Sequence, residues 1–328
     1  MEVGVQRRGS VLKRLGGSLL RCKEIGAVVS FGIVFLSFSL LIPDKFLTWR
    51  ALESLLVVAT RTGLLAIGMS LLLISREIDL SVGSIYAFIP CVAVSLIIYV
   101  GLPEIVAFAL ALGVAILMGL LNGVITTKVP LPSFITTLGF MMVWRGIALG
   151  IWLAWPMSYE GTSLFMSIVG GKFIGRVFNF SIVWLLLAAT FLWFLLEKTD
   201  YGNWVYATGD KEESARALGV NTQKVKIINF VILAFLTGVS GLVQFSRLGL
   251  AIATEGVGLE LEAIAAAVIG GTSLLGGYGT IWGAILGILL ISMLTVGVIL
   301  AGISTYWYRS LIGGIIILAV AINRRLLR

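Results

Sequence analysis

Long apolar runs recur along this chain, and short polar connections separate them. Most runs come close to the roughly 17 to 25 residues that an α-helix needs to cross a bilayer. The pattern therefore predicts an all-α membrane protein with about ten transmembrane helices, which places both ends of the chain on one side. The predicted spans lie near residues 25–42, 52–74, 83–100, 105–126, 133–154, 181–196, 225–245, 261–275, 281–301 and 307–322.

One polar stretch, residues 197–226, interrupts the apolar pattern and holds ten charged residues. Within it the run GDKEESARALGV predicts a short helix over residues 210–219, flanked by loop. Asp210 can cap the first turn, Glu213 stands in the capping-box position, and Gly219 suits the left-handed conformation after the last turn. A helix of about eight residues is marginal alone in water. It therefore packs either on its own loop and the bilayer surface or on a partner protein.

Composition assigns the chain to a class and excludes several chemistries. The chain is 59% hydrophobic and 12% charged, with a mean hydropathy of +1.07, whereas soluble domains carry about 25% charged residues. This is the composition of an integral membrane protein. Cys22 and Cys91 lie far apart and histidine is absent, so neither a disulfide framework nor a metal site is predicted. Membrane metalloenzymes and most hydrolase triads are disfavoured, and we expect no cofactor in this chain.

The net charge of +8 is best interpreted as membrane topology, so no nucleic acid partner is expected. With the N-terminus inside, sixteen of the 24 Lys and Arg residues lie inside, six lie outside, and Arg61 and Arg145 fall within spans. Positive charge concentrates on the cytoplasmic side, which predicts that both termini and residues 197–226 are cytoplasmic. The predicted divisions are a basic cytoplasmic segment over 1–24, one transmembrane domain over 25–322 and a cytoplasmic tail over 323–328.

The start of the chain leaves two interpretations open. The apolar run 26–42 lacks a small-residue cleavage pattern, so it is predicted to be a retained first span rather than a cleaved signal peptide. Residues 10–23 mix leucines with basic side chains. That segment is either an interfacial helix or a basic, mostly disordered tail.

The chain offers no site for its own energy source. A phosphate-binding loop needs the pattern G-x-x-x-x-G-K-[ST], and the nearest fragment, Gly170–Phe173, lacks the first glycine and the Ser or Thr. The predicted apolar spans hold no Asp or Glu in their interiors, which disfavours ion coupling through intramembrane carboxylates. Energy is therefore expected to arrive from a partner.

Two small-residue turns and two intramembrane cations stand out. In Ser75–Ser84, Asp79 or Ser81 either caps the next span or takes part in gating; Ala267–Thr280 loosely echoes this turn. An inverted repeat would place the two turns on opposite sides, but the predicted spans place them on the same side. Arg145 and Arg61 are functional candidates because charge inside a membrane is costly, although arginine can also reach the interface or bond carbonyl groups.

Four motifs carry a resemblance to a known family: IDLSVGS at 78–84, LPSFITTLGFMMVWRG at 131–146, ATGDKEESARALGVNTQKVK at 207–226 and the long glycine-rich run at 259–287. Together they resemble the monosaccharide permeases of bacterial ABC importers, the ribose, xylose, galactose and autoinducer-2 type. The resemblance covers roughly residues 55–322. The family typically shows two glycines where this chain has Arg76 and Glu77, and Arg61 is unusual for it.

The resemblance implies a subunit of about ten helices in the bacterial inner membrane that pairs with a second copy or a paralogue. It implies a separate cytoplasmic ATPase that binds ATP and Mg, and a periplasmic or lipid-anchored sugar-binding protein. The ATPase would dock on a coupling helix made of Asp210, Lys211, Glu212, Glu213, Ser214, Ala215, Arg216, Ala217, Leu218 and Gly219.

A sugar pathway should present hydrogen-bonding and stacking groups, although each such residue could equally serve ordinary helix packing. The candidates are Asn122, Ser133, Phe134, Thr136, Thr137, Phe140, Arg145, Thr272 and Ser273. The favoured function is the permease subunit of an ATP-driven importer for a monosaccharide or similar small polar solute, without enzymatic activity of its own. The alternatives are a nucleoside or branched-chain amino acid cargo, an ion-coupled transporter or channel, and a membrane-embedded enzyme.

Overall fold

The structure, a computed structural model, describes residues 25–129, 131–161, 163–174, 178–304, 307, 310, 313 and 314. This part of the chain is mostly helical. The helices are α2 (Ile25–Leu41), α3 (Pro43–Phe46), α4 (Trp49–Ile74), α5 (Val82–Ile98), α6 (Glu104–Lys128), α7 (Ser133–Trp152), α8 (Leu164–Gly170), α9 (Phe180–Lys198), α10 (Asp200–Asp210), α11 (Glu212–Ala217), α12 (Thr222–Leu248), α13 (Leu259–Ile269) and α14 (Ile281–Leu300). The strands are β1 (Met157–Ser158), β2 (Lys172–Ile174), β3 (Phe178–Asn179) and β4 (Leu250–Ala251).

Six of the described helices are long and apolar enough to cross a membrane: α4, α6, α7, α9, α12 and α14. The helices α2 and α5 are apolar but shorter, with 17 residues each. The chain is therefore a multi-pass membrane protein, as its hydropathy predicted. The span predicted at 307–322 lies almost wholly outside the described residues, as do residues 1–24 and 323–328. The count of about ten spans and the inward orientation of both termini stay predictions.

The span predicted at 261–275 is wrong. Helix α13 has 11 residues, and at 1.5 Å per residue it rises about 16 Å, roughly half of the hydrocarbon core of a bilayer. The backbone then leaves the helix, because Gly271, Gly276 and Gly277 have φ angles of 94°, 84° and 71°, in the left-handed region that glycine tolerates. Hydropathy alone could not reveal this break.

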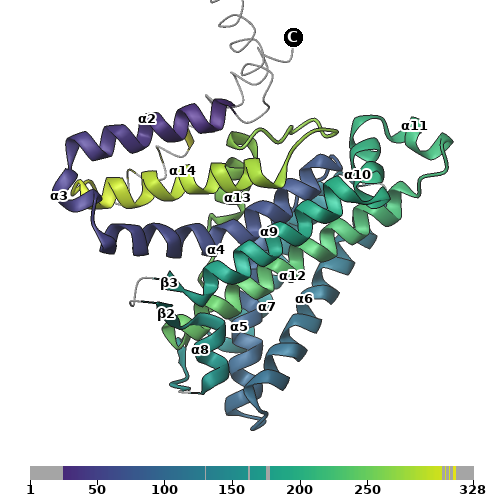
Figure 1. Ribbon diagram of the computed structural model, residues 1–328. Helices are drawn as coiled ribbons and strands as arrows, with labels where there is room; N and C mark the ends of the chain where they lie inside the picture. The colour runs from purple at the N-terminus through teal and green to yellow at the C-terminus, as the bar shows by residue number, and fades with distance from the viewer. Residues whose placement is uncertain are drawn as a thin grey trace, which may run out of the picture.

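Helix α12 runs through the middle of the bundle, and α6 lies along it (Figure 1). Two glycines on α6 make this close approach possible. A Cβ atom on Gly119 would lie 2.6 Å from the Cβ of Ala234 and 2.7 Å from the carbonyl oxygen of Phe230. A Cβ on Gly123 would lie 2.9 Å from the Cα of Ile227. Small residues at a helix contact allow backbones to pack closely in lipid.

The bundle has two distinct ends (Figure 1). At the α11 end, helices α10 and α11 lie beside the connections 75–81 and 270–280. The chain segments at this end also contact each other, since the N–H of Gly277 donates to the carbonyl of Ile74. At the hairpin end lie α8 and two small antiparallel pairs, β1 with β4 and β2 with β3. The hairpin end also closes through backbone hydrogen bonding of Tyr159 to Gly249.

The polar stretch contains two helices instead of the single predicted one. Helix α10 covers residues that were predicted to form a loop. Its buried residues include Gly202, Val205 and Gly209, spaced three and four apart, which is one face of a helix. A Cβ on Gly209 would lie 1.7 Å from the carbonyl oxygen of Ile74. This glycine lets α10 rest directly on the end of α4.

The predicted start of the short helix is also wrong. Asp210 is the last residue of α10, and Lys211 occupies the N-cap of α11 without a side-chain hydrogen bond. The predicted end is confirmed: Gly219 has a φ of 88°. Its N–H donates to the carbonyl of Arg216, and the N–H of Val220 donates to the carbonyl of Ala215. These two bonds form a Schellman motif, which ends α11 after six residues.

Candidate functional site

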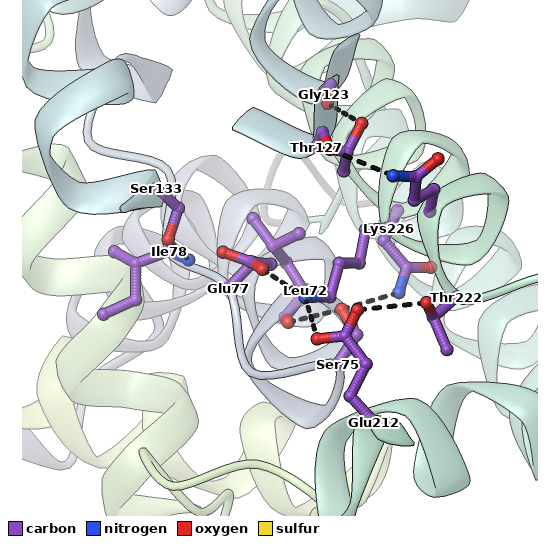
Figure 2. Close-up of polar contacts among 12 residues, drawn as sticks. Leu72, Ser75, Glu77, Ile78, Gly123, Thr127, Ser133, Glu212, Thr222 and Lys226 are labelled. Atoms are coloured by element: carbon purple, nitrogen blue, oxygen red, sulfur yellow. Dashed lines mark hydrogen bonds and ion pairs between the residues drawn. The ribbon is translucent and has the colours of Figure 1, made fainter. Parts of the chain in front are cut away.

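Three charged side chains from three separate elements meet at the α11 end. Lys226, in the first turns of α12, places its Nζ 2.7 Å from Oε1 of Glu77 and 2.8 Å from Oε2 of Glu212 (Figure 2). The Lys226 and Glu77 side chains are 12% and 11% exposed, whereas Glu212 is 33% exposed. We call this set the Lys226 bridge. Charges this deeply buried need partners, because a lone buried charge is strongly destabilising.

Glu212 is the first residue of α11 and fixes that helix to the bundle. Its Oε1 accepts a hydrogen bond from Thr222 Oγ1 at 3.0 Å and lies 2.5 Å from Arg216 Nη2. Burial alone would raise the pKa of the Glu212 carboxyl. The hydrogen bond and charge of Lys226, helped by Thr222 and Arg216, outweigh burial and lower that pKa below its ordinary value. Glu212 is therefore ionised at neutral pH and holds α11 through charge.

Glu77 reaches the bridge because α4 ends in a tight turn. Ser75 Oγ donates to the carbonyl of Leu72 and accepts from Asn229 Nδ2 at 3.0 Å, and the Glu77 N–H also donates to the Leu72 carbonyl. Arg76 takes a φ of 67°, which costs a residue with a Cβ on the order of 1 kcal/mol. The turn therefore adopts at residue 76 a conformation that suits glycine, the residue that the resemblance led us to expect there.

Beyond Glu77 the backbone runs without helical structure to α5, over a stretch that we call segment 77–81. Two hydroxyl groups on α7 bind its free N–H groups. Ser133 Oγ accepts from the N–H of Ile78 at 3.2 Å (Figure 2). Thr137 Oγ1 accepts from the N–H of Leu80 at 3.1 Å. Both residues were predicted as sugar-pathway candidates. In the structure they replace the hydrogen bonds that an α-helix would have supplied.

Asp79 is fully buried in this segment and forms the centre of a polar network. Its Oδ1 accepts from the N–H and the hydroxyl of Ser81 at 2.7 and 2.6 Å, and its Oδ2 accepts from Asn122 Nδ2 at 2.9 Å. Asn122 Nδ2 also lies 2.7 Å from Ser81 Oγ. A buried carboxylate requires such bonds. Ser81 stands at the N-cap of α5 without a side-chain cap, so capping alone does not describe the role of Asp79.

The second small-residue turn contacts the first. Ser70 Oγ lies 2.7 Å from Thr272 Oγ1, and Ser273 Oγ accepts from the N–H of Leu275 at 3.1 Å. With the bond from Gly277 to Ile74, these contacts place both turns at the same end. The span count predicted that arrangement, although one of the predicted spans is a half-length helix. Thr272 and Ser273 thus secure the turn between α13 and α14.

Arg145 bonds backbone carbonyls, one of the two interpretations left open. Its Nη1 donates to the carbonyl oxygens of Ala253 and Glu255 at 2.6 Å each, and its Nη2 donates to that of Gly83 at 3.0 Å. The guanidinium therefore joins the irregular chain before α13 to the start of α5. A Cβ on Gly83 would lie 2.4 Å from the carbonyl oxygen of Gly256, so the two segments touch.

The remaining pathway candidates lie along α7. The Phe140 ring stacks on Trp144 with centroids 5.3 Å apart. Thr136 is buried and its Oγ1 has no hydrogen-bond partner among the described residues, whereas Phe134 is 54% exposed. The nine pathway candidates therefore do not gather in one site. Their role in a sugar pathway stays a prediction.

A polar cavity of about 330 Å³ opens beside the Lys226 bridge, and none of the nine pathway candidates lines it. Its size is at the lower end of small-molecule pockets, about 300 to 1,000 Å³. Sequence reasoning missed this region because its residues come from three distant parts of the chain. The lining residues are Glu77, Thr126, Thr127, Leu131, Pro132, Glu212, Arg216, Gln223 and Lys226.

Comparison with known proteins supports, for most of the chain, the family that the sequence motifs resemble. Residues 51–320 match the family model described as branched-chain amino acid transport system / permease component. The ribose import permease protein RbsC of Escherichia coli K12 is 36% identical over 287 residues, covering 87% of this chain and 88% of that protein.

Two further relatives are named for the pentoses xylose and arabinose. The xylose/arabinose import permease protein XylH of Sulfolobus acidocaldarius is 37% identical over 268 residues, covering 80% of this chain and 74% of that protein. The L-arabinose ABC transporter permease protein AraH of Azospirillum brasilense is 35% identical over 318 residues, covering 94% and 90%. The chain therefore belongs to the family of ABC-transporter permease components that these proteins share.

Proposed function

We propose that this chain is the transmembrane permease subunit of an ATP-driven importer for a monosaccharide or a similar small polar solute. The sugar-named relatives support the cargo class. In this proposal the protein lies in a bacterial cytoplasmic membrane, and the α11 end faces the cytoplasm. A separate ATPase docks on α11 and binds ATP and Mg. A sugar-binding protein delivers cargo at the hairpin end, and a second permease, identical or a paralogue, completes the path.

The observation that carries the docking proposal is the two-sided character of α11. With six residues it is too short to be stable alone, and Glu212 and the buried Ala215 fasten one side to the bundle. The other side presents the exposed Glu213, and Leu218, which directly follows α11, is 84% exposed. Exposed apolar groups within a charged rim are typical of protein contact surfaces.

The experiment that tests docking uses matched leucines at the two ends. Leu218→Glu combined with Glu213→Lys should abolish co-purification of the ATPase, because central contacts dominate binding energy. Leu164→Glu should leave the ATPase bound, since Leu164 is 78% exposed but lies at the hairpin end. Membrane levels should match the unmodified protein for both. Undiminished ATPase binding by the double variant would refute the docking proposal.

A second cargo class has one specific observation in its favour, the family description that names branched-chain amino acids. The two classes differ in charge, because a neutral sugar needs hydrogen-bonding groups and an amino acid zwitterion needs paired charges. Uptake of labelled ribose, xylose, arabinose and leucine by proteoliposomes holding the whole importer separates them. We expect a sugar to be taken up, in an ATP-dependent way, and leucine to be excluded. Sugar uptake by this chain alone would contradict the proposal of a partner-driven permease.

A further inference from the structure

The Lys226 bridge joins three elements: helix α11, helix α12 and the start of segment 77–81. We propose that Lys226 is a positioning residue that transmits movement of α11 to segment 77–81, and through it to the buried Asp79. This inference rests on the proposed function, because it requires that a partner ATPase moves α11. It adds a specific residue and a route inside the bundle.

The first step of the route is the shared ammonium group. Lys226 Nζ holds one carboxylate from α11 and one from the end of α4, at 2.8 and 2.7 Å. The Lys226 and Glu77 side chains are almost buried, so water cannot readily replace either partner. Displacement of Glu212 therefore either pulls the ammonium with it or leaves the ammonium on Glu77 alone. Both outcomes change the charge balance at Glu77.

The second step leads from Glu77 into the bundle. Glu77 holds the start of segment 77–81 through Lys226 and through the bond from its N–H to the Leu72 carbonyl, and beyond Glu77 the segment is fastened by side chains of α6 and α7. Ile78 and Leu80 bind hydroxyl groups on α7, and Asp79 binds Asn122 on α6. Movement of Glu77 thus acts directly on bonds that hold two spanning helices. A segment with few, discrete polar bonds suits a switch between two arrangements.

The third observation is that the bridge has room to rearrange. The cavity of about 330 Å³ is lined by all three bridge residues. It is also lined by Thr126, which is 7% exposed and whose Oγ1 has no hydrogen-bond partner among the described residues. A hydroxyl in that position can accept a hydrogen bond from the Lys226 ammonium once Glu212 has moved away. Thr126 then stabilises the second arrangement of the bridge.

The test uses the whole importer, with its ATPase and binding protein, in proteoliposomes. Lys226→Met keeps the aliphatic stem and removes the charge. We expect the ATPase to remain bound, while the number of sugar molecules transported per ATP hydrolysed falls about tenfold, within the typical range of coupling between distant sites. Lys226→Arg should restore most of this ratio. The matched control is Lys224→Met, because Lys224 is an exposed lysine on the same helix.

Two further variants keep the proposal testable if Lys226→Met does not fold. Glu77→Gln keeps the shape of the side chain and should lower the same ratio. Thr126→Val removes the proposed second partner at constant shape and should also lower it. An unchanged ratio in Lys226→Met or Glu77→Gln would overturn the relay. So would loss of ATPase binding in these variants, because Lys226 would then be only an anchor for α11. ATPase binding that ignores Leu218 and Glu213 would instead refute the docking proposal.

Discussion

The two ends of the bundle each place a glutamate in the first turn of a helix, but they use it differently. At the hairpin end, Glu104 begins the 25-residue α6 and accepts hydrogen bonds from Tyr159 Oη at 2.9 Å and from Ser163 Oγ. At the α11 end, Glu212 begins a six-residue helix and holds the Lys226 ammonium. At the hairpin end, a carboxylate that accepts from two hydroxyl groups fixes a loop to a long helix. At the α11 end, a carboxylate paired with an ammonium group joins a short helix to α12 and, through Lys226, to Glu77.

The hydrogen bond at the hairpin end has a consequence for the tyrosine. This hydrogen bond raises the pKa of Tyr159 above its ordinary value, because Glu104 accepts it only while the phenol is protonated, and burial adds to this effect. The phenol therefore remains protonated and the clamp remains intact over the physiological pH range. The α11 end depends instead on a carboxylate whose pKa is lowered by a lysine partner. The hairpin end is therefore held by hydrogen bonds from hydroxyl groups, and the α11 end is held by an ion pair, which depends on the charges of its partners.

The largest effect is expected where backbone meets backbone at the α11 end. Gly209→Ala places a Cβ against the Ile74 carbonyl, a position only 1.7 Å away, so α10 must separate from α4. Overpacking of this kind costs about 1–3 kcal/mol or more. The unfolding temperature of the purified protein should fall clearly. Gly146→Ala on α7, where a Cβ meets nothing within 4 Å, is the control and should leave it nearly unchanged.

The next effect compares the two glutamates directly. Glu212→Ala removes the carboxylate that bonds Lys226, Arg216 and Thr222. Helix α11 then loses more anchors than it loses in Lys226→Met, so ATPase co-purification should weaken about tenfold, which corresponds to about 1.4 kcal/mol. Glu104→Ala should leave ATPase binding unchanged. Instead it should speed hydrogen exchange around Tyr159 and Ser163. Equal effects of the two substitutions on ATPase binding would remove the distinction between the ends.

A smaller effect is expected from the turn after α11. Gly219→Ala keeps open space around the new Cβ but forces it into a φ of 88°, which costs on the order of 1 kcal/mol. The last turn of α11 should fray, and its amides should exchange faster with solvent. Gly139→Ala, in the middle of α7 with no atom within 4 Å of the new Cβ, should not change exchange in α11.

The smallest expected effect is the acid dependence of the stability of α11. The folded-state pKa of Glu212 is below its ordinary value of 4.5, so its contribution to stability is fully present above that value and is lost as pH falls through the folded pKa. The protection of the α11 amides, taken as the ratio of the intrinsic exchange rate at each pH to the observed rate, should therefore fall below about pH 4.5. In Glu212→Gln this fall should be absent and the protection should be lower at neutral pH. A pH response in the variant equal to that of the unmodified protein would assign it to another group.

Much of the fold follows from local pattern. The spans predicted at 52–74 and 105–126 fall within α4 and α6, because run length alone decides whether a helix can cross a bilayer. The half-length α13 could not be predicted this way, since it depends on the φ angles of Gly271 and its neighbours. Helix α10 was missed because its buried face is made largely of glycine.

The candidate site was harder to predict because its contacts are distant in sequence. Glu77 was noted only as a departure from a motif, and Lys226 was counted only as a topological charge; their contact at 2.7 Å joins two parts of the chain. Asp79 was assigned to a turn, yet its partner Asn122 lies on another helix. Asn122 and Thr137 were chosen for a sugar pathway because they are polar within apolar runs. Residues that form hydrogen bonds with buried backbone groups are also polar residues within apolar runs.

The most direct test of the central claim is a crosslink from α11 to the ATPase. In a Cys22→Ser background, Leu218→Cys and Leu164→Cys place matched exposed thiols at the two ends, while the remaining Cys91 is buried. Treatment of the assembled importer with a short crosslinker that has one thiol-reactive and one amine-reactive end should join the Leu218→Cys chain to the ATPase and leave the Leu164→Cys chain unjoined. A crosslink to the ATPase from position 164, or none from position 218, would contradict the account.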